Sequence, residues 1–307
     1  MSVYTTIERD ELEDFLQHYP VGKLIQFEGI SAGIENTNYF VDTDKNRFVL
    51  TIFEALSKDE LPYFLDLMAH LAEHDVPSAH PEADDQGHYL RELKDKPAAL
   101  VQCLTGSSIE QPSSVQCAAL GKALGHLHVV GQSFAGNRAN ERGPHWWHVT
   151  ANAVMPHLSD EEQQLLKNEL DFQKQHAHDE LPRGVIHADL FRDNALFDGD
   201  LLTGIIDFYY ACNDVLLYDV AVTVNDWCVN EDGSLNKARL DALLAAYQQE
   251  RPLTDQEQLA WPVMLRAAAL RFWLSRLQDK YFPREGEITH IKDPDAFKRI
   301  LIDRASA

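Results

Sequence analysis

The sequence predicts an α+β protein with two lobes: a small, mostly β N-terminal lobe over residues 1–104 and a larger helical C-terminal lobe over residues 105–307. Short runs rich in β-branched and aromatic residues fill most of the first hundred positions, which favours strands. Long amphipathic segments dominate after them, which favours helices. The small polar residues TGSS at 105–108 are typical of a connector and predict the hinge between the lobes.

The N-terminal lobe is expected to begin with a short helix, because acidic residues follow Thr6 and the pattern runs to about His18. Three strands are predicted at KLIQFEGI, NYFVDT and RFVLTIFE, with a hairpin turn at DKN, residues 44–46. Leucines at helical spacing predict a helix in SKDELPYFLDLMAHLAEHD. HYLREL and AALVQCL predict two further strands.

The C-terminal lobe is expected to be built on long amphipathic helices. The segments that predict them are SSVQCAALGKALGHLHVVG, DEEQQLLKNELDFQKQHAH, LNKARLDALLAAYQQE and DQEQLAWPVMLRAAALRFWLSRLQDKYF. Between the second and the third lies GVIHADLFRDN, flanked by short strand-like runs. Its polar residues directly follow an apolar run. A fold rarely needs this pattern, but a functional site often does.

Composition limits the function classes. The formal net charge is −22, spread along the chain, so neither nucleic acid nor an anionic membrane surface is an expected partner. The polar N-terminus predicts no signal peptide, and no apolar run is long enough for a membrane span. The four cysteines lack metal-ligand spacing, which indicates reduced buried thiols. We expect a cytoplasmic enzyme that is a monomer or a small homo-oligomer.

The segment HADLFRDN and a later aspartate have the spacing of phosphotransferases of the protein-kinase type, H-x-D-x-x-x-x-N followed by D. Asp189 is the predicted group that receives or orients the proton of an attacking hydroxyl, and His187 is expected to brace the loop. Asn194 and Asp207 offer the hard oxygen ligands that Mg²⁺ prefers. A solvated loop that carries these residues by chance is the alternative.

Together with IDFYYA, this segment resembles the aminoglycoside-phosphotransferase and choline-kinase branch of the protein-kinase-like fold. More narrowly, segments along almost the whole chain resemble the bacterial homoserine kinases of that branch. IENTNYFV and DFYYACND are the more specific of these segments, whereas HADxxxxN alone identifies only the superfamily. The resemblance implies a two-lobed kinase-like fold, ATP and Mg²⁺ as cofactors, and transfer of a phosphoryl group to the hydroxyl of L-homoserine.

The nucleotide side carries weaker signals. The stretch GISAGIENTN lies between two predicted strands, where Ser31, Ala32, Gly33 and Asn36 are expected to cover the phosphates, although a plain hairpin turn also fits. The resemblance implies that the backbone near Gln102 and Leu104 binds adenine.

The lysine usual on the third strand of kinases is replaced by Thr51. Thr51 itself is one candidate for orienting a phosphate, and Arg47 and Lys58 are the others. Glu60 and Asp66 are interpreted as ordinary solvated acids. The missing lysine also leaves open a kinase-like protein that only binds, but the complete set of Asp189, Asn194 and Asp207 argues against that class.

Acceptor contacts are expected near the metal ligands. Homoserine is a zwitterion, so its pocket needs an acid for the ammonium group and a cation for the carboxylate. Arg271 lies on an otherwise apolar helix, where an unpaired charge is costly. Tyr210 and Asp226 complete the predicted set, with Arg266 and Arg276 as further candidates. Asp219 is expected to brace the catalytic loop, and choline, aminoglycosides and hydroxylysine remain as alternative acceptors.

Overall fold

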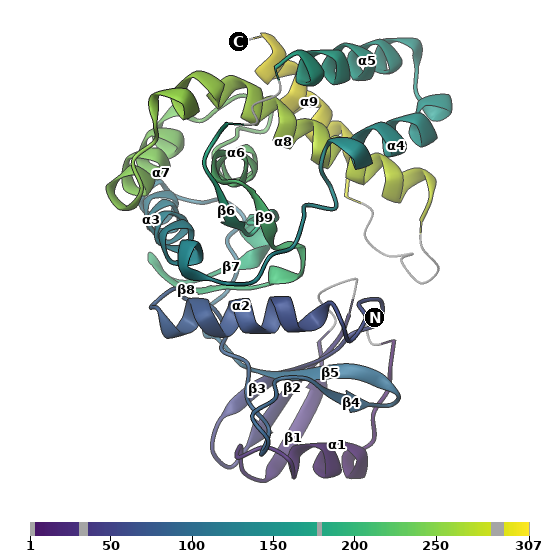
Figure 1. Ribbon diagram of the computed structural model, residues 1–307, viewed down its shortest axis with the longest axis vertical. Coiled ribbons are helices and arrows are strands. Elements are labelled where there is room, and N and C mark those ends of the chain that lie inside the picture. The colour runs from purple at the N-terminus through teal and green to yellow at the C-terminus, as the bar shows by residue number, and fades with distance from the viewer. Residues whose placement is uncertain (1–3, 31–35, 177–179, 284–291, 307) are drawn as a thin grey trace.

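The structure, a computed structural model, describes residues 4–30, 36–176, 180–283 and 292–306. In Figure 1 the strands β1 to β5 form a sheet at one end of the molecule, and most of the helices lie at the other. The N-terminal elements are α1 (Arg9–Leu16), β1 (Leu24–Gly29), β2 (Thr37–Thr43), β3 (Arg47–Ile52), α2 (Leu61–Glu73), β4 (Arg91–Leu93) and β5 (Lys96–Gln102). Each predicted element of this lobe is therefore present.

The five strands form one antiparallel sheet in the order β1-β2-β3-β5-β4. Its two faces pack against different partners. Phe48, Leu50 and Ile52 of β3 join the apolar residues of α1 in a small core of their own. The other face packs against α2, whose buried residues are continuous with the core of the helical lobe. In Figure 1 α2 lies between the sheet and that lobe.

The C-terminal lobe contains the four predicted helices as α3 (Ser114–Val130), α5 (Asp160–Gln175), α7 (Lys237–Glu250) and α8 (Asp255–Tyr281). It also contains helices that the sequence pattern did not predict: α4 (Pro144–Val154), α6 (Leu216–Trp227) and α9 (Pro294–Ser306). The remaining elements are η1 (Gly131–Ser133), η2 (Met155–His157), β6 (Arg183–Ile186), η3 (Arg192–Asn194), β7 (Ala195–Asp198), β8 (Leu201–Ile205), η4 (Phe208–Tyr210) and β9 (Cys212–Val215).

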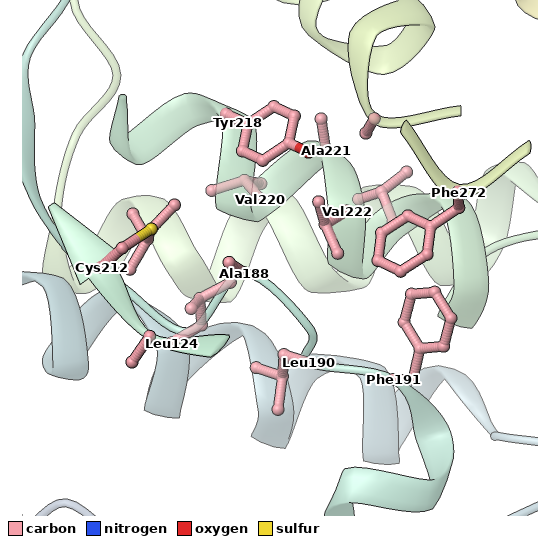
Figure 2. Close-up of a cluster of buried hydrophobic side chains, with 14 of the residues drawn as sticks. Leu124, Ala188, Leu190, Phe191, Cys212, Tyr218, Val220, Ala221, Val222 and Phe272 are labelled. Atoms are coloured by element: carbon pink, nitrogen blue, oxygen red, sulfur yellow. The ribbon is translucent and has the colours of Figure 1, made fainter. Parts of the chain in front are cut away.

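Helix α6 escaped prediction because all of its residues are buried, including Asp219 and Asp226. Its polar residues Asp219, Thr223 and Asp226 do have helical spacing, but the alternating valines between them favour a strand reading. It is nevertheless central to the lobe. In Figure 2 its side chains Tyr218, Val220 and Val222 lie in one apolar cluster with Phe272 of α8.

The predicted catalytic segment contributes apolar side chains to that same cluster. Ala188, Leu190 and Phe191 are buried, with Leu190 fully enclosed, and Figure 2 shows them beside the residues of α6. The polar residues of the segment alternate with these anchors. Packing therefore fixes the course of the backbone from which Asp189 projects.

Close packing of α3 on α7 completes the wall behind the segment. A methyl group at Gly121 would lie 2.3 Å from the carbonyl oxygen of Leu243, so only glycine permits this approach. Strand β5 ends at Gln102, and Ser107 already exchanges two backbone hydrogen bonds with Phe197 of β7. The predicted boundary after residue 104 falls between these points. No helix in the described ranges is long and apolar enough to cross a membrane.

Candidate active site

A buried carboxylate holds the backbone of the catalytic segment. Asp219, in the first turn of α6, accepts hydrogen bonds from the N–H groups of His187 and Ala188, each at 2.8 Å. The Nε2 atom of His128 lies 3.1 Å from the same carboxylate. Ala188 has a φ of +64°, a left-handed conformation that costs an L-residue free energy, so these bonds enforce an unfavourable turn. Asp219 thus braces the loop as expected.

His187 links this turn to the strand that precedes Asp207. Its ring is fully buried, with Nε2 donating to the carbonyl oxygen of Ile206 at 3.0 Å. Its Nδ1 accepts from the N–H of Asp189 at 3.3 Å, which leaves the ring no position for a second proton. Burial lowers the pKa of His187, in agreement with a neutral ring. The ring of His187 thus links the catalytic segment to the strand before Asp207.

Asp189, Asn194 and Asp207 come together in space. The Asn194 Nδ2 donates to the carbonyl oxygen of Asp189 at 2.8 Å and approaches its Oδ2 at 3.2 Å. Burial raises the pKa of the Asp189 carboxyl, the guanidinium of Arg271 lowers it, and the nearby charge of Asp207 raises it, so that the pKa is about 7. A carboxyl that titrates near neutrality suits proton transfer.

The donor set fits a hard divalent cation. The Asn194 amide nitrogen faces Asp189, so its amide oxygen is directed elsewhere and can act as a ligand. Asp207 precedes η4 in a left-handed conformation, with φ at +63°, which ends strand β8 close to this point. Over the described ranges no group of three or more His, Cys, Asp or Glu side chains could hold a metal. Mg²⁺ commonly takes one or two protein oxygen ligands and completes its shell with phosphate and water oxygens.

At the lysine position of β3 the structure has a hydrogen-bonded neutral pair. The buried Thr51 hydroxyl donates to Asn38 Oδ1 at 2.7 Å, and a hydrogen bond links Thr51 to Tyr209, next to Tyr210 in η4. The alternative cations lie elsewhere. Arg47 pairs with Asp42, and Lys58 pairs with Glu92 on the surface.

The predicted phosphate-covering residues Ser31, Ala32 and Gly33 lie outside the described residues. Asn36 follows them and accepts from the N–H of Glu54 at 3.3 Å, which ties the end of the loop to the end of β3. At the hinge, the N–H of Gln102 donates to the carbonyl oxygen of His80 at 2.9 Å. The half-buried Leu104 packs over Gly204 of β8.

A cavity of about 210 Å³ adjoins the catalytic segment at Ala188. Tyr210 and Arg271, both predicted to contact the acceptor, line it, as does Asn36. Asp226 lies elsewhere. Its carboxylate accepts from the N–H and the Nε of Arg192 at 2.8 and 3.1 Å and lines a second cavity that also includes Arg276.

Among the residues that line this cavity, Arg271 gives the clearest indication that a ligand binds there. Its side chain is 4% exposed, and its NH1 lies 3.6 Å from Asp189 Oδ1, which is longer than a hydrogen bond. Throughout the described ranges its guanidinium makes no hydrogen bond; it packs against the rings of Phe272 and Tyr210. A buried guanidinium with unused donors that borders a cavity is suited to bind an anion there. Arg266, by contrast, is held by Glu169.

The sequence analysis missed one wall of this cavity, residues 138–142 and Glu60. Glu60 is not an ordinary solvated acid, because it binds Arg138 at 3.0 Å and its pKa is lowered to about 2, chiefly by hydrogen bonds from Ser57. The segment RANER has neither periodicity nor motif spacing. Only its charge density could have marked it.

Comparison with known proteins agrees with this geometry. Residues 26–253 match the model of the phosphotransferase enzyme family, which is most of the chain. The chain belongs to the phosphotransferase enzyme family. Its similarity to homoserine kinases spans nearly the full length. It is 54% identical over 301 residues to the homoserine kinase of Methylobacillus flagellatus, which covers 98% of this chain and 94% of that protein.

Further relatives and solved structures extend this result. The homoserine kinase of Neisseria meningitidis is 43% identical, over 98% of this chain and 99% of that protein. The amicoumacin kinase hAmiN, in complex with AMP-PNP, Ca²⁺ and Ami, has a TM-score of 0.72 at 14% identity and covers 98% of this chain and 93% of its own. Spectinomycin phosphotransferase has a TM-score of 0.69 at 12% identity, with 99% of both chains covered. The predicted two-lobed kinase-like fold is confirmed.

Proposed function

We propose that this phosphotransferase moves the γ-phosphoryl group of ATP to the side-chain hydroxyl of L-homoserine. The observation that carries the proposal is Arg271, a buried guanidinium with unused donors that lines a cavity next to Asp189. An acceptor with a hydroxyl and a carboxylate a few bonds apart can use both groups there. The near-full-length similarity to homoserine kinases supports the same acceptor.

In the reaction the acceptor oxygen forms a bond to the γ-phosphorus while the bond to the ADP oxygen breaks. Asp189 receives the hydroxyl proton, for which its pKa of about 7 is suited. The products are ADP and O-phospho-L-homoserine, an intermediate of threonine biosynthesis. Because phosphoryl transfer demands mainly positioning and charge neutralisation, the rigid backbone around Ala188 contributes by fixing where Asp189 points.

Asn194 and Asp207 would hold Mg²⁺, which when bound neutralises the charge of the phosphate oxygens. Asn194 has a second part in the proposal, since its amide nitrogen holds Asp189 in place. ATP would be bound by the backbone at residues 102–104, with Ser31, Ala32, Gly33 and Asn36 near the phosphates and Thr51 contributing a hydroxyl. The use of ATP agrees with a cytoplasmic location.

On the acceptor side, Arg271 would bind the carboxylate of homoserine beside the ring of Tyr210. Choline has no carboxylate, so a buried arginine would cost binding free energy instead of supplying it. Asp226 has no part in this proposal, because its carboxylate is already held by Arg192.

The test is a coupled assay of ADP release with L-homoserine, choline, hydroxylysine and an aminoglycoside as acceptors. We expect kcat/KM to be highest for L-homoserine by at least roughly a hundredfold, the discrimination available to a site that pairs buried polar groups. A higher value for any other acceptor would refute the proposal. Release of ADP without any acceptor serves as the background.

A further inference from the structure

Two arginines from different parts of the chain approach one ring in the cavity. The guanidinium carbons of Arg271 and Arg142 lie 5.5 and 5.9 Å from the centre of the Tyr210 ring, and all three residues line the cavity. Arg271 belongs to α8, whereas Arg142 lies just before α4. Two positive charges therefore border the same ring and the same cavity, although 129 positions separate them in sequence (271 − 142).

Arg142 has little to neutralise it. In the described ranges it has no ion pair; its NH1 reaches Gln278 Oε1 at 3.4 Å, and its guanidinium stacks on Trp146 at 4.7 Å. Arg138 on the same wall provides the contrast. It is bound by the carboxylates of Glu60 and Glu141, so its charge is already compensated.

The backbone at Arg142 is fixed in advance of any ligand. Its N–H donates to Asn140 Oδ1 at 2.8 Å, and its carbonyl oxygen accepts from Trp147 Nε1 at 2.7 Å. Asn140 is itself anchored, because its Nδ2 donates to Asp214 of β9 at 2.7 Å. Arg142 is thus positioned from the strand that follows η4, the element that carries Tyr210.

We propose that Arg142 is a specificity-determining residue that, together with Arg271, forms a two-arginine seat for the carboxylate of the acceptor. Planar guanidinium groups bind carboxylates through paired hydrogen bonds, and both guanidinium groups lie within 6 Å of the centre of the Tyr210 ring in the same cavity. The seat selects hydroxy amino acids over amino alcohols without a carboxylate. This inference rests on the proposed function and adds the second arginine to it.

The experiment compares L-homoserine with 3-aminopropan-1-ol, which keeps the hydroxyl and the amine but lacks the carboxylate. Steady-state kinetics are measured for the wild type, Arg142→Met, Arg142→Lys and the control Arg239→Met. Arg239 is a half-buried arginine of α7 that bonds to the carbonyl oxygen of Val229 and does not line the cavity. Thermal melting and the KM for ATP report whether each variant is folded.

For Arg142→Met we expect the KM of L-homoserine to rise roughly 10- to 100-fold, the usual cost of losing a hydrogen bond to a charged group. Its kcat should change little, and kcat/KM for 3-aminopropan-1-ol should stay at the wild-type value. For Arg142→Lys the KM of L-homoserine should lie between those of the wild type and Arg142→Met, because lysine keeps the charge but loses the paired hydrogen-bond geometry. If the methionine variant does not fold, the lysine variant tests the proposal by the same comparison of L-homoserine with 3-aminopropan-1-ol.

Equal losses of kcat/KM on both acceptors, or an unchanged KM for L-homoserine, would overturn the proposal of a two-arginine seat. A fall in kcat on both acceptors at constant KM would also overturn it, since Arg142 would then act on the phosphoryl group. The proposed function fails separately, if the wild type does not phosphorylate L-homoserine at all. Arg239→Met should match the wild type on both acceptors.

Discussion

The catalytic segment and the nucleotide-facing strand β3 are built in opposite ways. Around Ala188 the backbone is held by a buried carboxylate, a neutral histidine and apolar anchors in the main core. On β3 the position usual for a charged lysine carries Thr51, which is satisfied by a neutral hydrogen bond to Asn38. Most of the sheet residues around it belong to a small separate core. The fixed charges for catalysis are thus concentrated in the helical lobe.

The two regions differ in how exactly a side chain has to be positioned. In the proposed reaction Asp189 must meet a particular hydroxyl, and its loop has an unfavourable backbone turn enforced by Asp219. The nucleotide phosphates can be held by backbone groups, which do not require a particular side chain.

The largest effect is expected for Asp189→Asn. The amide keeps the shape but cannot receive the hydroxyl proton, so kcat should fall by about 10² to 10⁴. Rapid-quench or coupled kinetics with saturating ATP and homoserine measure it. A kcat within a factor of about three of the wild type would show that the hydroxyl needs no base here.

The same variant should change how stability depends on pH. Because the pKa of Asp189 is raised in the folded protein to about 7, folding takes up a proton, and the wild type loses stability as pH rises from about 4 to 7. Asparagine does not ionise, so the variant does not lose stability in this way. In the nucleotide-free protein the melting temperature of Asp189→Asn should therefore exceed that of the wild type increasingly over that window and by a constant margin above it. An equal margin at pH 4 and pH 8 would contradict the raised pKa.

Asp219→Ala should be the most damaging change to the fold. It leaves the N–H groups of His187 and Ala188 and the ring of His128 without their acceptor, and breaking a buried charged network costs about 3–5 kcal/mol. Urea unfolding measures the loss. The control is Asp241→Ala, where an exposed pair with Lys237 should contribute less than about 0.5 kcal/mol. Similar losses in both variants would remove the bracing role of Asp219.

A smaller effect is expected on the nucleotide side. Thr51→Ala removes one neutral hydroxyl, worth about 1 kcal/mol, so kcat/KM for ATP should fall roughly tenfold or less. Thr51→Val, which keeps the branched shape, is the matched variant and should behave in the same way. A thousandfold loss in a folded Thr51→Ala enzyme would show that the strand carries as much of the chemistry as the catalytic segment.

The smallest effect tests the strained turn directly. Ala188→Gly should relieve about 1–2 kcal/mol of left-handed strain, which offsets the greater flexibility of glycine in the unfolded chain. Ala195→Gly is the control, because Ala195 is also buried but has an ordinary extended φ of −129°. Urea unfolding should show that Ala195→Gly costs about 1–2 kcal/mol more than Ala188→Gly. Equal costs would mean that the turn at Ala188 stores no strain.

Sequence patterns alone determined much of this protein. Strand-like runs and four long helical segments predicted the two lobes, because residue types and their spacing along the chain favour one kind of element over the other. The spacing of His187, Asp189, Asn194 and Asp207 predicted a phosphotransferase, because that chemistry requires particular oxygen atoms in a particular order. Both kinds of signal are local or depend on fixed spacing.

Other features of the fold and of the site depend on packing between elements that are distant in the sequence. All residues of helix α6 are buried, the polar ones included, and the burial of Asp219 follows from the packing of other elements around this helix. Arg142, Tyr210 and Arg271 line one cavity, an arrangement that depends on contacts between distant positions such as the hydrogen bond from Asn140 to Asp214 of β9. Asp226 is a reasonable candidate by sequence, but folding places Arg192 beside it. Proximity between remote residues is a property of packing, and the order of residues does not contain it in readable form.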